Sequence, residues 1–526
     1  MNVSRRALVL GAAGAGAAVA VPTLLPFRAD SGAPARLPAS KFPKMFTVPF
    51  AHAPVAQPIR RDATTDYYRI SLEQFTAELL PGIATSMYGY NGSFPGPTIR
   101  ATRGRTVIAR FENNLPSMHP AWAYESFANI HLHGGASLPQ YDGYASDIIH
   151  PGQYKDYVWL NTECGRSAWY HDHAMHHTSL NVYAGLAGRY LVDDPAENAL
   201  GLPRGEFDVS LQLSDAMFQA DGGLYASLVN TKGLWGDVLL VNGRPWPRME
   251  VKRRKYRFRM VNACGSRTFF LRLSTGDPLV VIGSDAGLAP APIPVPAFRI
   301  TNGERYDFVV DFAKYPAGTR VELINDSLPY NDDYPTTGKV MAFDVVDGAF
   351  DPANNDVPRE LAPSNRVMTT PTPAQPTIRN IKTIRQGGEW TINGNTWNDV
   401  IDSEYGLVES TVLKGATEVW EFQNNSGGWS HPMHVHGVDA RIISRNGKAP
   451  YAYENCPKDT FRLGENETIR VQMTFREPGK YMIHCHNVVH EDHDMMSQYE
   501  CIDPNGAAAD SPFAASAEPL LDARSL

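Results

Sequence analysis

The sequence predicts an all-β chain of three consecutive β-sandwiches. Three Asn-Gly pairs recur at a spacing of 151 residues in both intervals, at Asn91-Gly92, Asn242-Gly243 and Asn393-Gly394. A fixed period of this kind marks repeated structural units. Each pair is followed by runs of alternating apolar and polar residues, and Gly, Pro, Asn and Asp separate these runs, which is typical of short strands and turns. The 526 residues accommodate three such units.

Matching strands are expected at equivalent places in the three repeats. Similar strand-like runs end in Asn, at residues 107–113, 256–262 and 419–424. The repeats also close alike, at residues 188–193, 341–346 and 498–503. We therefore predict sandwiches at 45–195, 196–346 and 376–510, a linker rich in Pro, Asn and Asp at 347–375 and a tail at 511–526. We expect few long helices, with short helical turns such as one after His173.

The first 35 residues are predicted to be an export leader and not part of the fold. Arg5 and Arg6 precede an apolar run, rich in Ala and Gly, that reaches Val21. This is typical of a twin-arginine signal, and an ordinary Sec signal is the alternative. Cleavage follows Ala20 or lies nearer Ala35. No other stretch is long and apolar enough to span a bilayer, so we expect a soluble periplasmic or extracellular protein without a transmembrane anchor.

Charge and cysteine content narrow the possible partners and cross-links. The net charge of -8 argues against nucleic acid as a partner. Four cysteines besides Cys485 could form zero, one or two disulfides in an oxidising compartment, and buried free thiols are the alternative. These four are Cys164, Cys264, Cys456 and Cys501.

The histidines are unevenly distributed. The chain has 16 of them, and none lies between His177 and His431, so the middle unit has none. Four clusters stand out: His131-Leu-His133, His171-Asp-His173, His431-Pro-Met-His434-Val-His436, and His484-Cys485-His486 with His490 and Met495. In a strand, His-x-His places both imidazoles on one face. The first and third units are therefore candidates for metal binding.

The fourth cluster predicts two metal sites back to back. Blue-copper sites use two His, one Cys and a weak axial Met, which Cys485, His490, Met495 and one distant His would supply. Because side chains alternate along a strand, His484 and His486 point to the opposite face, and a second site must lie directly behind the first. Zinc is the competing metal, but structural zinc takes four ligands that are often Cys-rich, whereas here many imidazoles share one thiolate. Copper is favoured.

At these clusters the chain resembles the three-domain multicopper oxidases. The runs 484–496 and 169–175 are particularly similar to those of bilirubin oxidases and related bacterial laccases. The resemblance covers nearly the whole mature chain. It implies three cupredoxin-like Greek-key sandwiches and four copper ions, one type 1, one type 2 and two type 3. It also implies an exported oxidase that couples one-electron oxidation of phenolic, aminophenolic or bilirubin-like substrates to four-electron reduction of O2 to water.

The resemblance also assigns the copper ligands. The type 1 copper would be held by His431, Cys485 and His490 with Met495 as axial ligand. The type 2 copper would be held by His131 and His434. The type 3 pair would take His133, His171, His173, His436, His484 and His486. The three-copper cluster would then lie between the first and third units, and the middle unit would be a spacer that sets their geometry.

Further residues receive roles from the same resemblance. An exposed edge of His431 would accept the electron, and Cys485 would pass it on. Asp142 is predicted to relay protons, with a turn aspartate as the alternative. Val489 excludes a glutamate relay at its own position. Met495 indicates a moderate potential, because the axial ligand tunes it.

The remaining histidines are predicted to lie outside the metal sites. We expect structural or neighbouring roles for His176, His177 and His493, and surface positions for His52, His119 and His150. Trp429 either shapes the substrate surface or packs in the core.

Two other functions are weighed against the oxidase of aromatic substrates. A cuprous, ferrous or manganous oxidase in metal homeostasis is the alternative, although the 15 methionines form no Met-rich tract. A copper carrier without activity would need no connected pair of sites. The sequence fixes neither the physiological substrate nor the oligomeric state.

Overall fold

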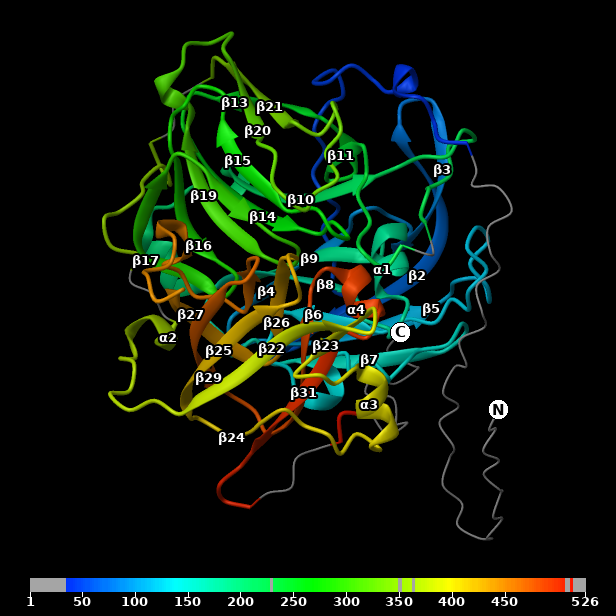
Figure 1. The fold of residues 1–526 in the computed structure, drawn as a ribbon. Coiled ribbons are helices and arrows are strands. Elements are labelled where there is room, and N and C mark those ends of the chain that lie inside the picture. The colour runs from blue at the N-terminus through cyan, green and yellow to red at the C-terminus, as the bar shows by residue number, and fades with distance from the viewer. Residues whose placement is uncertain (1–34, 228–229, 349–351, 362–364, 507–510, 514–526) are drawn as a thin grey trace. The chain divides into compact units, whose positions relative to one another are not determined.

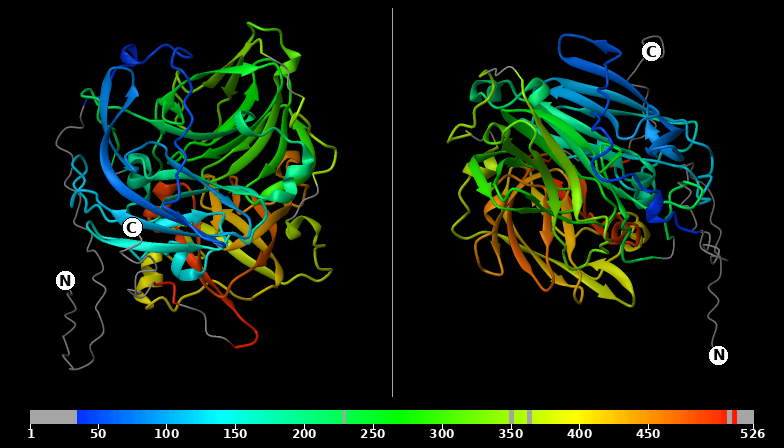
Figure 2. Two further views of the ribbon diagram at one scale, coloured as in Figure 1. Left: turned by 180° about the vertical axis from the view of Figure 1, so that it is seen from behind. Right: turned by 90° about the horizontal axis from the view of Figure 1, so that it is seen from above.

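The computed structural model describes residues 35–227, 230–348, 352–361, 365–506 and 511–513. The expected leader, apart from Ala35, and most of the expected tail lie outside the described residues. The described strands form six sheets, two within each predicted sandwich (Figure 1). The blue-to-cyan, green and yellow-to-red parts of the chain can be followed in two further views in Figure 2. The all-β prediction is confirmed.

The first sandwich combines a five-stranded and a four-stranded sheet. The larger sheet has the order β1-β2-β5-β7 with β3 beside β2: β1 (Arg60–Arg61), β2 (Thr65–Leu80), β3 (Ile83–Tyr90), β5 (Thr106–Asn113) and β7 (Tyr154–Trp159). The smaller has the order β4-β9-β8-β6: β4 (Gly96–Thr102), β9 (Ala187–Asp193), β8 (Arg166–Asp172) and β6 (Ile130–His133). Helix α1 (Thr178–Ala184) follows β8, as the sequence predicts.

The second sandwich combines a seven-stranded and a five-stranded sheet. The larger has the order β12 (Arg244–Pro245), β11 (Val238–Val241), β10 (Asp208–Ala216), β14 (Lys255–Asn262), β19 (Arg305–Asp311), β16 (Leu279–Ser284) and β17 (Gly287–Val295). The smaller has the order β13 (Arg248–Lys252), β21 (Lys339–Val346), β20 (Arg320–Asn325), β15 (Phe269–Leu273) and β18 (Phe298–Ile300).

The third sandwich combines two five-stranded sheets. One has the order β23 (Glu389–Ile392), β22 (Ile378–Gln386), β25 (Thr417–Asn425), β29 (Thr468–Phe475) and β27 (Val438–Arg445). The other has the order β24 (Thr411–Leu413), β31 (Met496–Ile502), β30 (Gly479–Cys485), β26 (His431–Val435) and β28 (Thr460–Leu463). The remaining α-helices are short: α2 (Arg366–Thr369), α3 (Trp397–Asp402) and α4 (Val488–Asp492).

The sequence repeat is a repeat of topology. In each sandwich the strand that carries the repeated run lies parallel to an earlier long strand, as β5 does with β2, β14 with β10 and β25 with β22. The terminal residues Asn113, Asn262 and Asn424 also make equivalent contacts. Each side-chain amide donates to two backbone carbonyls outside its own strand, and each side-chain oxygen accepts from the backbone N–H two residues ahead. The repeated asparagine thus ties each strand end to its loops.

Two other expectations concern cysteines and membranes. All five cysteines are buried and free, so the described residues contain no disulfide. The alternative of buried free thiols therefore holds. None of the helices in the described part of the chain is long and apolar enough to cross a membrane.

Candidate metal centre

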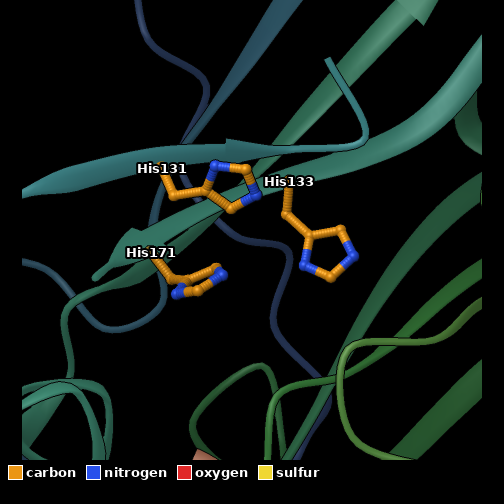
Figure 3. Close-up of side chains that lie close together, drawn as sticks. All are labelled: His131, His133 and His171. Atoms are coloured by element: carbon orange, nitrogen blue, oxygen red, sulfur yellow. The ribbon is translucent and has the colours of Figure 1, made fainter. Parts of the chain in front are cut away.

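Adjacent strands bring the four histidine clusters together in pairs. In the first sandwich, antiparallel β6 and β8 place His131 opposite His171. In the third, antiparallel β26 and β30 place His434 opposite His484 and Met433 opposite Cys485. Figure 3 shows the rings of His131 and His133 on one side of β6, near the ring of His171. Strand pairing thus places the imidazoles of two sequence clusters side by side on adjacent strands in each of these sandwiches.

One compact group contains the only thiol among these ligand candidates. The Cys485 sulfur lies 3.4 Å from His431 Nδ1 and 3.7 Å from His490 Nδ1, and these two nitrogens are 3.3 Å apart. All three side chains are fully buried. Buried Met495 is held beside them, because the Cys485 N–H donates to the Met495 carbonyl over 3.1 Å. A trigonal His2Cys set with a nearby Met is the donor set of a blue-copper site.

The outward-facing ring nitrogens fix which atoms of this group can bind a metal. His490 Nε2 donates to the Lys232 carbonyl over 2.9 Å, because a carbonyl can only accept, and its Nδ1 therefore keeps a lone pair. His431 Nε2 lies 2.8 Å from Ser426 Oγ. Burial lowers the pKa of His431 to about 3, so its ring is neutral. The expectation of an exposed His431 edge is wrong, since this ring is covered by Ser426 and its surroundings.

The other eight histidines of the clusters form a second group. It draws four rings from the first sandwich and four from the third, which is the predicted location between those units. Overlapping sets of ligand atoms lie within 4.8 Å of one another: His131 with His133 and His171, His131 with His434 and His436, and His173 with His436 and His484. His486 joins through its Nε2, which lies 3.2 Å from His133 Nδ1. All eight are buried.

Ring nitrogens of different histidines lie close together in this second group. His131 Nε2 is 3.4 Å from His434 Nε2, and His436 Nε2 is 3.1 Å from His484 Nε2. Their outer nitrogens are occupied by acceptors: His131 Nδ1 donates to the Asp142 carbonyl over 2.6 Å, and His434 Nδ1 to the Asp459 carbonyl over 3.0 Å. The inward nitrogens of these two rings therefore carry lone pairs that face each other.

This arrangement fits bound metal ions. Burial lowers the pKa of His171 to about 3 and that of His173 to about 4, so the rings are neutral. Among the described atoms, His171 Nε2 is buried without a hydrogen-bond partner. Facing lone pairs and an unpartnered buried nitrogen are costly unless a cation lies between them. Eight imidazoles exceed the four ligands of one structural zinc ion, so the donor set suits several ions.

Strand β30 connects the two groups. Cys485 faces His431 and His490, while its neighbour His484 faces His173 and His436. The side-chain alternation predicted for this strand is confirmed. Consecutive Cα atoms are about 3.8 Å apart, so the two groups are joined by the shortest covalent path available between residues.

Asp142 and Glu491 are two of the buried carboxylates that contact the eight-histidine group. Asp142 Oδ2 accepts from His436 Nδ1 over 2.7 Å, and burial holds the pKa of Asp142 well above its usual range. Glu491 Oε2 lies 3.0 Å from His484 Nδ1. Burial would raise the pKa of Glu491, but the neighbouring imidazoles lower it to about 2. Glu491 was not predicted, although it directly follows His490, because acidic groups were considered only at positions 142 and 489.

The histidines outside the two groups are mixed in location. His119 was expected at the surface, but it is buried and its ring stacks on Trp122 with centroids 4.2 Å apart. The surface position was inferred only because His119 belongs to no histidine cluster. That inference failed because nearby aromatic rings cover it. His52 is exposed and His150 half-buried. The rings of His176, His177 and His493 each contact a backbone carbonyl.

A cleft lies beside the group formed by Cys485, His431 and His490. Its lining includes Tyr330, Trp429, Arg462 and Asn487. Trp429 is half-buried, and the ring of Tyr330 lies 6.4 Å from it. Asn487 Nδ2 is 3.2 Å from His490 Nε2, so the cleft borders the group of Cys485 directly.

Comparison with known proteins identifies the family of these motifs. Family models described as multicopper oxidase match residues 72–197 and 370–504. The chain is 40% identical to bilirubin oxidase of Albifimbria verrucaria over 86% of this chain and 81% of that one. It is 33% identical to a laccase of Bacillus subtilis, over 85% and 97%. A multicopper oxidase crystal structure from Pediococcus acidilactici superposes with a TM-score of 0.78 at 26% identity, covering 91% and 96%.

Proposed function

Because the chain belongs to the multicopper oxidases, we propose that it is an exported oxidase of phenolic, aminophenolic or bilirubin-like compounds. It is a copper-dependent oxidoreductase with O2 as acceptor, and its cofactor is four copper ions, one of type 1, one of type 2 and two of type 3. The observation that carries the proposal is the placement of Cys485 in one histidine group between neighbours that belong to the other.

The residues of the two groups take the following roles in this proposal. His431, Cys485, His490 and Met495 would hold the type 1 ion, and His131 and His434 would hold the type 2 ion. The type 3 pair would be held by His133, His171, His173, His436, His484 and His486. Four bound ions supply one-electron storage for the four electrons that convert O2 to water.

Residues of the chain itself provide the electron path between the two groups, hold a proton and exclude water from the metal sites. Cys485 connects the groups through its peptide neighbours, His484 in β30 and His486 directly after the strand. Asp142 orients His436 and holds a proton at its carboxyl group, since Oδ1 is buried without a hydrogen-bond partner among the described atoms. Glu491, in helix α4, places a carboxylate oxygen 3.0 Å from His484 Nδ1. Both histidine groups are fully buried, which limits the escape of reactive oxygen species.

The cleft beside Trp429 is the proposed substrate site. It offers two aromatic rings, Tyr330 and Trp429, on which a planar reductant can stack. Ser430 and Pro432, which flank His431 in the sequence, also line it. A reductant held there would reach His431 through these neighbours, because the imidazole itself is covered.

Oxygen uptake by the copper-loaded protein tests the substrate class. Bilirubin, 2,6-dimethoxyphenol, an o-aminophenol and Cu(I) are compared, with Trp429→Ala as the matched variant. We expect uptake with the aromatic reductants and a lower kcat/KM in the variant for these alone. A large rate only with Cu(I) would instead support metal oxidation in metal homeostasis.

Export rests on the pair Arg5 and Arg6. Replacing both by Lys in the full-length precursor should leave the protein in the cytoplasm of a bacterial host that has the twin-arginine system. Unchanged export would favour a Sec signal.

A further inference from the structure

A buried ion-pair network lies directly behind the eight-histidine group and contains residues from the middle sandwich. Arg305, at the start of β19, is fully buried. Its Nη1 and Nη2 donate to the two carboxylate oxygens of Asp459 over 2.8 and 2.5 Å. Its Nε donates to the Ser167 carbonyl in β8 over 3.0 Å. One guanidinium therefore joins all three sandwiches at the metal group, although the middle sandwich has no histidine.

Asp459 contacts one imidazole from each outer sandwich. Its Oδ1 lies 3.1 Å from His133 Nε2, and its backbone carbonyl accepts from His434 Nδ1 over 3.0 Å. The carboxylate can only accept, so His133 Nε2 carries the hydrogen and His133 Nδ1 keeps its lone pair. That Nδ1 is the atom 3.2 Å from His486. Thr460 Oγ1 lies 3.0 Å from His133 Nε2 and is a second acceptor for it, so Asp459 and Thr460 together determine which nitrogen of His133 can bind a metal.

Asp459 is itself held in place by neighbouring groups. Arg305 donates to both of its carboxylate oxygens, and its backbone N–H donates to Asp285 Oδ2 over 3.2 Å. Asp285 is held in turn by Lys458 Nζ at 3.0 Å. A bidentate arginine–carboxylate pair fixes both position and orientation more strictly than a single contact.

The middle sandwich approaches the group at a second point. Gly303, two residues before Arg305, has a φ of +78°, and a Cβ there would lie 2.6 Å from His486 Cδ2. Arg305 Nη1 also donates to the Gly303 carbonyl over 2.9 Å. The loop that packs against His486 and the arginine that clamps Asp459 are therefore one unit.

We propose that Asp459, clamped by Arg305 of the middle sandwich, is a positioning residue that fixes His133 and His434 for metal binding across the junction of the first and third sandwiches. This inference rests on the proposed function, because the metal ions are those of the multicopper oxidase cluster. It gives the histidine-free sandwich a direct role in building the cluster. Residues that orient metal-bound histidines are commonly worth a 10- to 100-fold change in metal affinity.

Asp459→Asn tests the proposal with copper content as the readout. The amide retains an acceptor for His133 but presents a donor to Arg305, so the clamp is broken. We expect type 1 copper to remain, with its visible absorption, while type 3 and type 2 copper are lost about 10- to 100-fold more readily to a chelator, the type 2 ion being followed by its electron paramagnetic resonance signal. Asp215→Asn is the matched control, because Asp215 forms a buried pair with Arg267 at 2.9 Å that touches no histidine.

The outcomes separate this inference from the proposed function. Wild-type copper content and chelator resistance in Asp459→Asn would overturn the inference, as would an equal loss of type 2 copper in the Asp215→Asn control. If Asp459→Asn does not fold, Arg305→Lys replaces it, because lysine keeps the charge but loses the bidentate geometry. Its type 2 copper should then be lost more readily than in wild type, and full retention would refute the clamp. A wild-type protein that binds fewer than four copper ions would refute the proposed function itself.

Discussion

Asp142 makes two separable contacts with the eight-histidine group, and two substitutions distinguish them. Its backbone carbonyl accepts from His131, while its carboxylate accepts from His436 Nδ1 over 2.7 Å. Asp142→Ala keeps the first contact and removes the second. Asp142→Asn restores an acceptor for His436 but cannot give up a proton as an acid.

The structure sets the size of each effect. In Asp142→Ala the buried N–H of His436 is left without a partner, which costs about 1–3 kcal/mol. This corresponds to a roughly 5- to 150-fold weaker hold on copper, at about 1.36 kcal/mol per factor of ten. In Asp142→Asn copper content should stay near wild type while kcat falls roughly 10²- to 10⁴-fold, the usual range for loss of a general acid or base.

Copper per chain and oxygen uptake under saturating reductant measure the two effects. Electron transfer into the type 1 site should remain at its wild-type rate in Asp142→Asn, since the residues around Cys485 are untouched. Wild-type turnover in Asp142→Asn would refute the proton role. Full copper retention in Asp142→Ala would refute the orienting role.

Three further outcomes are expected. Met495→Leu should raise the type 1 potential measured by redox titration, because a weak axial ligand is lost; an unchanged or lower potential counts against axial binding. Gly303→Ala should reduce type 3 copper, since the added Cβ would lie 2.6 Å from His486. Gly318→Ala is its control: Gly318 has a φ of +86° and no atom within 4 Å of an added Cβ, so this variant should show only the backbone strain. Equal copper loss in both variants would contradict this expectation. In the metal-free protein, burial lowers the folded-state pKa of His171 to about 3 from an unfolded value of about 6.5. The unfolded chain therefore binds protons in this interval that the folded chain does not, and the thermal midpoint should fall as pH drops below about 6.5; a midpoint that stays flat to about pH 4 would contradict it.

Much of the fold could be predicted from local pattern. The Asn-Gly period and the strand runs ending in Asn113, Asn262 and Asn424 reflect a repeated topology, because the same asparagine contacts recur in each sandwich. The two histidine groups were also predictable, because alternation along β30 directs the side chains of Cys485 and His484 to opposite faces of the strand. Alternation along a strand has a period of two residues, and the three sandwiches repeat similar sequence runs. Both patterns are visible in the sequence.

The contacts that could not be predicted join residues far apart in the chain. Arg305 and Asp459 are 154 positions apart, and no motif marks either as a neighbour of His133. The covering of His431 by Ser426 and the stacking of His119 on Trp122 depend on loop shape, which residue spacing does not encode. Glu491 carried a signal in its position after His490, but only the structure places its carboxylate beside His484.

The central claim is that two metal sites are built on one strand. It is tested most directly by measuring copper content and visible absorption of the wild-type protein and of Cys485→Ser side by side. The wild type should hold four copper ions and absorb intensely in the visible through its thiolate–copper bond. Cys485→Ser should lose that absorption and the type 1 ion, yet keep type 2 and type 3 copper, because the eight-histidine group does not use the sulfur. A wild type without this absorption, or a Cys485→Ser variant that keeps it, would contradict two metal sites built on one strand.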